Sequence, residues 1–335
     1  MIVTHYKEPW EVGKRLFDMI AMQRNIRFQD VGVILVNDGE ENELPSECFE
    51  GYPYEIHQLS IPHGGVSRAR NAGLDASTAD YVMFCDFDDS FSSVFGLHLI
   101  FAAMQEDKYD YIWSNFTEET MDDDGVIHLV AHGRDFVFVH GKVMRRQFLV
   151  DNSLRFHPKL TIHEDAFLNL IAQEVAEPER IGSINTPFYV WQWNDRSVVR
   201  KDRSDDYVLD TYDHLIRQKI AITEDLIRRG MGEKVIGAVV KTVVDCYYDC
   251  QNPNWRLPKN KERLHKVQNW FAAYLKRYAN YYTQADVRMI SSVARICREQ
   301  AMRENKFLME FETISDWLKN IMDKAKPVPR EWQDV

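Results

Sequence analysis

Two short apolar runs near the start of the chain end abruptly in acidic or turn-forming side chains. Residues 31–36 (VGVILV) are followed by Asn-Asp-Gly, and residues 81–85 (YVMFC) are followed by Asp-Phe-Asp-Asp. Short apolar runs bounded in this way are typical of strands that are buried on both faces. Segments with helical spacing of apolar residues separate them, so strands and helices alternate. This alternation predicts an α/β fold with a mostly parallel sheet and helices on both of its faces.

The same reasoning assigns the other elements and two domains. We expect strands at residues 1–4, 31–36, 54–59, 81–85, 109–113 and 188–193, helices at residues 10–22, 67–76, 94–105, 141–152 and 164–173, and a hairpin turn at residues 122–125. Beyond about residue 204 the spacing of apolar residues is almost wholly helical, with helices expected at residues 209–226, 235–248, 262–282, 286–304 and 314–322. We therefore predict an α/β domain at residues 1–204 and an α-helical domain at residues 205–335.

The charge of the chain is distributed unevenly. The formal net charge is −11; residues 1–204 hold 33 acidic and 19 basic side chains, whereas residues 205–335 hold 19 acidic and 22 basic ones. An acidic chain is a poor non-specific binder of nucleic acid, because phosphates attract clustered Lys and Arg. In the first domain, a divalent cation would offset the acidic excess.

Cysteine use and hydropathy indicate a cytoplasmic protein. The five cysteines are an odd set without the spacing of a disulfide framework, which is typical of a reducing compartment. Cys246 and Cys250 lie on an expected helix, where we interpret them as buried hydrophobes with a metal pair as the alternative. We find no signal peptide and no run of about 18 apolar residues that could span a membrane. We expect a cytoplasmic location, with at most peripheral contact at the inner face of the membrane.

Asp86, Asp88 and Asp89 directly follow the buried run at residues 81–85. Three carboxylates this close repel one another, and they are costly at the edge of a core unless a positive charge lies among them. Mg²⁺ and Mn²⁺ prefer oxygen ligands and often bind one or two carboxylates together with substrate phosphates. We therefore predict an Mn²⁺ or Mg²⁺ site here; the alternative is a solvated acidic loop with helix-capping side chains.

Four segments in order carry a resemblance to a known family. They are residues 4–6 (THY), 33–39 (VILVNDG), 63–73 (HGGVSRARNAG) and the Asp cluster at residues 86–89. Together they resemble the Asp-x-Asp region of glycosyltransferase family 2 and the segments that precede it. That family is inverting and has the GT-A fold. The resemblance therefore implies a Rossmann-like domain that binds a nucleotide sugar, and it ends near residue 200.

The resemblance also implies which residues contact the donor. Tyr6, with Thr4 beside it, would stack near the nucleotide base, and Asp38 would form hydrogen bonds with that base, most often uracil. Arg68 and Arg70 would lie near the donor pocket, where a planar guanidinium suits phosphate oxygens. The alternative for Arg68 is a surface helix position.

In this interpretation, the Asp cluster at residues 86–89 contacts both the metal ion and the donor sugar. The resemblance implies that Asp86 approaches the ribose or the donor sugar. Asp88, with Asp89 as the second candidate, would hold the metal that bridges the diphosphate. The alternative to a donor-binding role is structural for both residues: Tyr6 would be a half-buried aromatic residue, and Asp38 would form a turn.

A second acidic pair, Glu164 and Asp165, opens the helix expected at residues 164–173. The structural alternative is a favourable interaction with the helix dipole. Residues 141–146 (GKVMRR), residues 154–156 (LRF) and this pair are together similar to the acceptor-side segment of bacterial family 2 enzymes for surface polysaccharides. The similarity implies that Asp165 is the catalytic base and Glu164 a supporting residue. A base removes the proton of the attacking hydroxyl as the new bond forms, which typically contributes ~10²–10⁴-fold to the rate.

Residues 189–200 (YVWQWNDRSVVR) resemble the end of the family's catalytic domain. The Gln-x-x-Arg-Trp motif of processive synthases is absent, which favours the addition of one sugar per event. Trp191 or Trp193 could stack on a sugar, although a core position is at least as common for tryptophan. Arg196 is a candidate for contact with the acceptor or the diphosphate.

The leading hypothesis is an inverting hexosyl- or N-acetylhexosaminyltransferase. It would move a sugar from a nucleotide sugar, most often a UDP-sugar, to a hydroxyl of a surface glycan or glycopolymer. One alternative is a phage-type enzyme that glycosylates a hydroxylated DNA base, which the acidic charge disfavours. Another is a catalytically silent GT-A binding protein. The helices at residues 205–335 are expected to bind the acceptor or to form a homo-oligomer.

Overall fold

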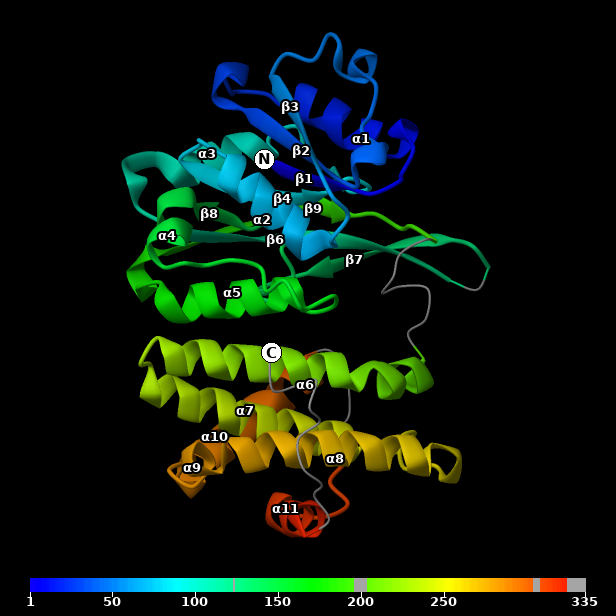
Figure 1. Ribbon diagram of the computed structural model, residues 1–335, viewed down its shortest axis with the longest axis vertical. Coiled ribbons are helices and arrows are strands. Elements are labelled where there is room, and N and C mark those ends of the chain that lie inside the picture. Colours follow the sequence, from blue (N-terminus) through cyan, green and yellow to red (C-terminus); the bar gives the residue numbers. More distant parts are fainter. Residues whose placement is uncertain (123, 196–203, 304–307, 324–335) are drawn as a thin grey trace. The chain divides into compact units, whose positions relative to one another are not determined.

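The computed structural model describes residues 1–122, 124–195, 204–303 and 308–323 of the chain. The chain divides into two compact units, Met1–Arg200 and Lys201–Val335. Figure 1 shows a β-sheet with flanking helices in the first unit and helices in the second.

Among the described residues, the sheet of the amino-terminal unit has nine strands. Its order is β3-β2-β1-β4-β8-β6-β9-β5, with β7 paired to β6. The strands are β1 (Ile2–His5), β2 (Gly32–Asp38), β3 (Glu55–Ile61), β4 (Tyr81–Asp86), β5 (Ser90–Phe91), β6 (Tyr111–Met121), β7 (Ile127–His132), β8 (Val143–Arg145) and β9 (Ile181–Trp191). β1 to β4 are parallel, so their carboxyl ends share one edge. β6 and β9 are also parallel, whereas β5, β7 and β8 pair antiparallel. The sheet is therefore mixed, and its parallel half carries the acidic strand ends.

Helices flank both faces of this sheet. They are α1 (Trp10–Ala21), α2 (Val66–Ala76), α3 (Gly96–Met104), α4 (Arg146–Asp151) and α5 (Glu164–Val175). On one face, Leu16 of α1 belongs to a buried cluster with Val3 and Leu35 of the central strands. Side chains alternate along a strand, so Ile2 points to the other face, where it meets Gly73 of α2. This arrangement confirms the α/β fold class that the sequence predicts.

The prediction of a helix at residues 141–152 is wrong for the first part of that range. Val143–Arg145 form strand β8, which pairs with both β4 and β6, and helix α4 begins only at Arg146. The reason is tertiary: Val143 and Met144 are buried between two strands, and a short apolar segment does not reveal its pairing partners. The strands expected at residues 109–113 and 188–193 belong to the longer β6 and β9.

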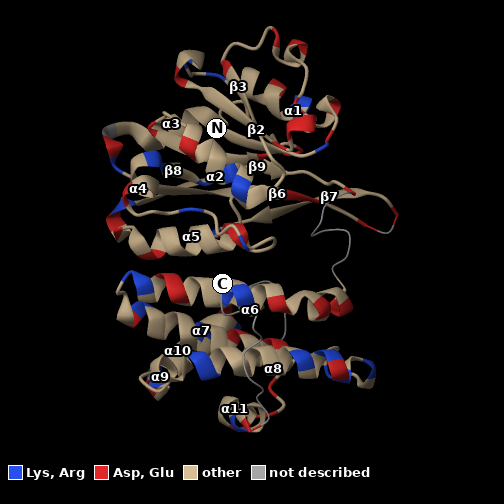
Figure 2. Cartoon of the chain, viewed as in Figure 1, with Lys and Arg blue, Asp and Glu red and all other residues tan. Residues whose placement is uncertain are grey.

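The carboxyl-terminal unit consists of helices. They are α6 (Asp205–Arg228), α7 (Gly232–Cys250), α8 (Lys261–Arg277), α9 (Ala279–Tyr282), α10 (Val287–Arg303) and α11 (Ile314–Met322). Apolar side chains of α6 and α7 are fully buried, Ile220 and Val243 among them. Acidic and basic residues both occur along α6 and α8 (Figure 2). The helix expected at residues 262–282 is interrupted at Tyr278, which separates α8 from α9.

All five cysteines are free thiols, and Cys246 and Cys250 are buried in α7. Among the described residues, the side chains that could together hold a metal ion are Asp86, Asp89 and His140, and neither cysteine belongs to that group. Burial without metal-binding partners supports the interpretation of both cysteines as small hydrophobes. Within the described part of the chain, the helices are too short or too polar to cross a bilayer.

We predict that Gly73→Val destabilises the protein, because a Cβ atom at this position would overlap Cγ2 of Ile2. Overpacking of this kind typically lowers the free energy of unfolding by about 1–3 kcal/mol. Gly32→Val is the matched control, since a Cβ atom there meets no atom within 4 Å. Its effect should stay within about 0.5 kcal/mol. Urea unfolding measures both variants, and equal stabilities would contradict the close packing of α2 on β1.

Candidate active site

A cavity of about 620 Å³ opens at the carboxyl edge of the parallel strands. Ligands of open α/β sheets bind at this edge, beyond the strand ends. Arg70 is the one Lys or Arg among the described residues that line the cavity. The acidic lining residues are Glu8, Asp38, Asp86, Asp88, Glu164 and Asp165. The cavity thus gathers six carboxylates around one guanidinium, which favours a cation or a ligand that arrives with one.

A larger cavity, of about 750 Å³, lies at the opposite edge, where Met1, Gly32 and Tyr81 mark the starts of three strands. Among its charged lining residues, Arg145 forms an ion pair with Asp107. This edge receives the amino ends of the parallel strands, and among the described residues its lining includes neither the Asp cluster at residues 86–89 nor the pair Glu164 and Asp165. We therefore place the site in the cavity at the carboxyl edge.

Asp38, at the end of β2, forms one end of the cavity. Its carboxylate accepts hydrogen bonds from the backbone N–H groups of Gly64 (2.7 Å) and Gly65 (2.9 Å). Nδ1 of His63 lies 2.9 Å from the same carboxylate. The His63 ring stacks on Tyr6 with 4.5 Å between ring centroids, and Tyr6 is 38% exposed. An aromatic face beside a carboxylate suits a planar base that carries N–H donors.

Arg70 lies in the acidic wall of the cavity and is only 3% exposed. Its two terminal nitrogens donate to Asp86 Oδ1 and to Glu164 Oε1, each at 2.8 Å. Oγ1 of Thr4 donates to the same Asp86 oxygen at 3.3 Å. Arg70 therefore joins α2, β4 and α5, and carboxylates already engage the nitrogens expected to face phosphate. Its neighbour Arg68 is exposed and does not line the cavity.

Burial and these ion pairs set the protonation of the acidic wall. Burial raises the pKa of Asp86, but Arg70, His140 and the hydrogen bonds to this carboxylate together outweigh burial, so this pKa lies below its ordinary value. Burial raises the pKa of Glu164 by more than Arg70 lowers it. Burial, reinforced by the charge of Glu164, also raises the pKa of Asp165. Asp86 is therefore ionised, whereas burial makes the ionised forms of Glu164 and Asp165 unfavourable.

Asp88 and Asp89 are neighbours in the chain but have different surroundings. Asp89 is fully buried: it accepts hydrogen bonds from the Tyr189 hydroxyl at 2.6 Å and from the Gln192 N–H at 3.1 Å. Asp88 is half-buried, lines the cavity and accepts a hydrogen bond from the Asn194 side chain at 2.7 Å. Asp89 therefore ties the loop after β4 to the end of β9, whereas Asp88 faces the cavity.

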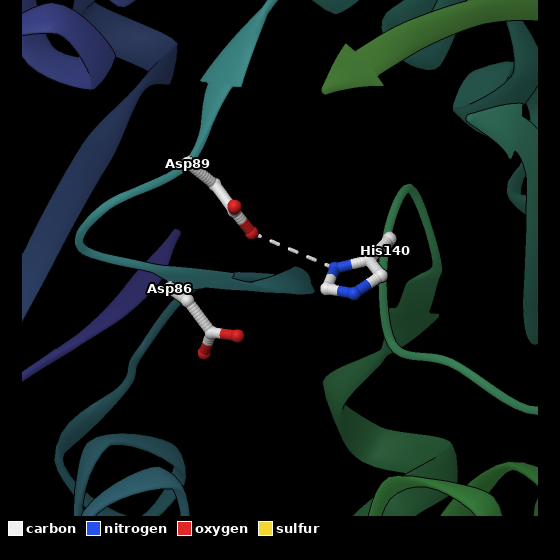
Figure 3. Close-up of side chains that lie close together, drawn as sticks. All are labelled: Asp86, Asp89 and His140. Atoms are coloured by element: carbon white, nitrogen blue, oxygen red, sulfur yellow. Dashed lines mark ion pairs between the residues drawn. The ribbon is translucent and has the colours of Figure 1, made fainter. Parts of the chain in front are cut away.

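His140 approaches this carboxylate cluster from the loop before β8. Its Nδ1 lies 3.6 Å from Asp89 Oδ2 (Figure 3). One ligand atom from each of Asp86, Asp89 and His140 lies within 4.8 Å of the other two. Both oxygens of Asp89 already accept hydrogen bonds, so Asp86 and Asp88 offer the carboxylates that face the cavity. This oxygen-rich set fits Mg²⁺ or Mn²⁺.

Glu164 and Asp165 occupy the first turn of α5. Glu164 is bound to Arg70, whereas among the described residues Asp165 accepts a single hydrogen bond, from the Ala166 N–H at 2.7 Å. Asp165 lines the cavity, so it can accept a hydrogen bond from a ligand. The preceding His163 has a left-handed backbone with φ 67°, a conformation that non-glycine residues adopt at a cost and often at functional sites.

The two tryptophans that could stack on a sugar, Trp191 and Trp193, differ in whether they line the cavity. Trp191 lines the cavity and is half-buried. Trp193 does not line it, and its backbone N–H donates to Glu119 at 3.0 Å. Arg196 lies outside the described residues.

Three residues of the site had no assigned role in the sequence interpretation: His63, His140 and Tyr189. His63 lies in the segment at residues 63–73 that carries the family resemblance, and that position was the available signal. His140 and Tyr189 carry no local signal. They reach Asp89 because β9 lies beside β5 and because the chain returns through the loop before β8.

Residues 1–159 match the family described as Glycosyl transferase family 2. The amino-terminal unit belongs to this family. EpsJ of Bacillus subtilis (strain 168), described as an uncharacterized glycosyltransferase, is 26% identical over 193 residues, which are 50% of this chain and 54% of EpsJ. GgaB of the same strain, described as a minor teichoic acid biosynthesis protein, is 37% identical over 71 residues, which are 20% of this chain and 8% of GgaB. The chain thus spans about half the length of EpsJ and a small part of GgaB.

Solved structures of S. aureus TarS share the fold of this chain. TarS 1–349 in complex with UDP-GlcNAc has a TM-score of 0.58 over 91% of each chain, at 15% sequence identity. TarS 1–349 alone has a TM-score of 0.56 over 91% of each chain, at 16% identity. The resemblance to family 2 and the GT-A fold that it implies are therefore confirmed.

We predict that Arg70→Met destabilises the family 2 unit by about 3–5 kcal/mol, because it leaves the carboxylates of Asp86 and Glu164 buried without their cation. The loss should shrink as the pH falls, since protonated carboxyl groups no longer need that cation. Arg68→Met, on the exposed side of the same helix, is the matched control and should change stability by less than about 0.5 kcal/mol. Urea unfolding compares the two variants; matching midpoints would show that Arg70 does not hold the acidic wall together.

Proposed function

We propose that the chain is a metal-dependent glycosyltransferase that moves a hexosyl or N-acetylhexosaminyl group from a UDP-sugar to a hydroxyl group with inversion. One observation carries the proposal: a single cavity contains Asp38 for the base, Asp86 and Asp88 for a cation, and Asp165 for the acceptor proton. Membership of family 2 supports glycosyl transfer. The complex of TarS with UDP-GlcNAc supports a UDP-sugar as the donor.

The charge of the cavity is the reason to propose a metal. A nucleotide diphosphate is anionic, and the cavity surrounds one guanidinium with six acidic side chains, among which Asp86 has a lowered pKa and keeps its charge. Arg70 is a poor partner for that diphosphate, because its terminal nitrogens already bind Asp86 and Glu164. Asp86 and Asp88 would hold Mn²⁺ or Mg²⁺, with the buried Asp89 behind them. A cation bound there would offset the charge that develops on the departing diphosphate.

Asp165 is the proposed catalytic base. It would accept the proton of the acceptor hydroxyl while that oxygen attacks the anomeric carbon from the face opposite the diphosphate. Glu164 is a positioning residue: its ion pair with Arg70 holds the first turn of α5 and thereby the direction of Asp165. Burial raises the pKa of Asp165, which makes its carboxylate a stronger base.

The proposed acceptor is a hydroxyl of a surface glycan or glycopolymer, in keeping with the naming of GgaB for teichoic acid biosynthesis. We assign the carboxyl-terminal helices to acceptor binding or to homo-oligomerisation. Val287 and Met302 of α10 are 79% and 71% exposed, and apolar side chains at such exposure suit a partner surface. The free thiols are in keeping with action in the cytoplasm, including at the inner face of the membrane.

We predict that Asp88→Asn abolishes the Mn²⁺-dependent binding of the donor, because the cation loses the half-buried carboxylate that faces the cavity. The test is a thermal-shift panel of nucleotide sugars with and without Mn²⁺, since a ligand that binds only the folded state raises the melting temperature. Asp75→Asn, at an exposed position of α2, is the control and should keep the shift of the wild type. A full Mn²⁺-dependent shift with UDP-GlcNAc in Asp88→Asn would refute the metal assignment.

Asp165→Asn should keep the donor affinity within about twofold and lower kcat by ~10²–10⁴-fold, because it removes the base and not the donor site. The dependence of kcat/KM on pH in the wild type gives a second test. A base acts as the carboxylate, so kcat/KM should rise with pH, and the raised pKa of Asp165 places that rise well above about 3.9, the value for an ordinary aspartate. Turnover retained in Asp165→Asn would exclude Asp165 as the base.

A further inference from the structure

The loop between β7 and β8 forms part of the cavity wall. Its residues Val137, Phe138 and His140 line the cavity. The carboxylate of Asp135 accepts hydrogen bonds from the backbone N–H groups of Val137 (3.0 Å) and Phe138 (2.9 Å). The buried ammonium of Lys142 lies 3.3 Å from the same carboxylate. These contacts hold the loop in one conformation at the cavity.

The catalytic helix α5 fixes where this loop lies. Asn169 donates to the carbonyl of Val137 at 2.7 Å, and Gln173 donates to the carbonyl of Phe136 at 3.2 Å. Asn169 and Gln173 follow Asp165 at intervals of four residues, so all three side chains lie on the same face of the helix. The loop therefore runs along the face of α5 that carries the proposed base.

Phe138 and Trp191 present aromatic surface at this place. Their ring centroids lie 5.2 Å apart, and both side chains are half-buried and line the cavity. His140, which is 3% exposed, backs them: its ring lies 4.9 Å from that of Trp191, and it stacks on Tyr189 at 5.1 Å. The two half-buried rings, Phe138 and Trp191, form what we call the aromatic platform.

We infer that the aromatic platform binds the ring of the acceptor sugar, so that the acceptor is a pyranoside rather than an open-chain polyol. The inference rests on the proposed function and specifies its acceptor. One face of a pyranose ring is lined by C–H groups and packs on an aromatic surface, while hydroxyl groups at its edge remain free for polar partners. An open-chain polyol such as ribitol has no such face.

The position of the platform distinguishes the acceptor from the donor base. Asp38 and Tyr6, which suit the base, lie at the ends of β2 and β1. The platform instead arises from β9 and from the loop held against α5, and it lines the same cavity as Asp165. A sugar ring on Phe138 and Trp191 would therefore share the cavity with the group that is proposed to remove its proton.

The test measures acceptor binding and donor binding separately. Methyl β-D-glucopyranoside, methyl N-acetyl-β-D-glucosaminide and ribitol are titrated against the full chain with UDP and Mg²⁺, and binding is followed by saturation-transfer NMR. We expect saturable binding of at least one pyranoside and none of ribitol. Phe138→Leu and Trp191→Leu keep apolar volume without the ring, and each should weaken pyranoside binding about three- to tenfold. Phe138→Tyr should restore it.

Two controls make the result specific. Phe95→Leu removes an aromatic ring that is 45% exposed outside the cavity, and it should bind the pyranoside as the wild type does. The affinity for UDP-GlcNAc with Mg²⁺ should change by less than about twofold in the Phe138 variants, which also shows that they are folded.

Ribitol binding as tightly as the pyranosides, no pyranoside binding at all, or unchanged binding in both leucine variants would each overturn the aromatic platform. Failure of the wild type to bind any nucleotide sugar would instead overturn the proposed function. The donor titration therefore separates the two failures.

Discussion

One buried guanidinium holds the acidic edge of this protein together. Arg70 on α2 contacts Asp86 at the end of β4 and Glu164 at the start of α5, so three segments far apart in the sequence meet at one cation. Buried ions recover their desolvation cost only when the geometry is good, and both contacts here measure 2.8 Å. The positions of the strand and of both helices are thus fixed at the place where we propose that the donor and the acceptor bind.

The parallel half of the sheet could be predicted because each of its strands carries its own signal. The apolar runs at residues 31–36 and 81–85 form most of β2 and β4. These two strands end at Asp38 and Asp86, and turn-forming or acidic residues follow them. β8 has no such signal, since three residues become a strand only because β4 and β6 lie on either side of them. The shift in register between Ser114 and Phe116, where β9 pairs with β6, is likewise a property of two strands together.

The site, too, combines residues that can be recognised from their own segment of sequence with contacts that depend on distant segments. The sequence identifies the carboxylates at strand ends and at a helix start that line the cavity, because each follows a recognisable apolar run or opens a helical pattern. It does not predict which of them are engaged by the protein. Arg68 and Arg70 lie in one motif, but only Arg70 lies on the buried side of α2. The loop before β8 reaches the cavity through hydrogen bonds from Asn169 and Gln173, and no pattern in either segment indicates that contact.

The acidic residues come in neighbouring pairs, and geometry gives the two members different surroundings. Side chains of successive helical residues point about 100° apart. Glu164 can therefore bind Arg70 while Asp165 meets the cavity. The pair after β4 divides in the same way: Asp89 binds Tyr189 and the backbone of β9, while Asp88 remains at the cavity. In each pair the engaged member anchors the backbone that its neighbour needs, because a lone carboxylate on an unanchored turn could move away from the other charges. Glu164 and Asp89, which bind Arg70 and the end of β9, thus fix the turns that place Asp165 and Asp88 at the cavity.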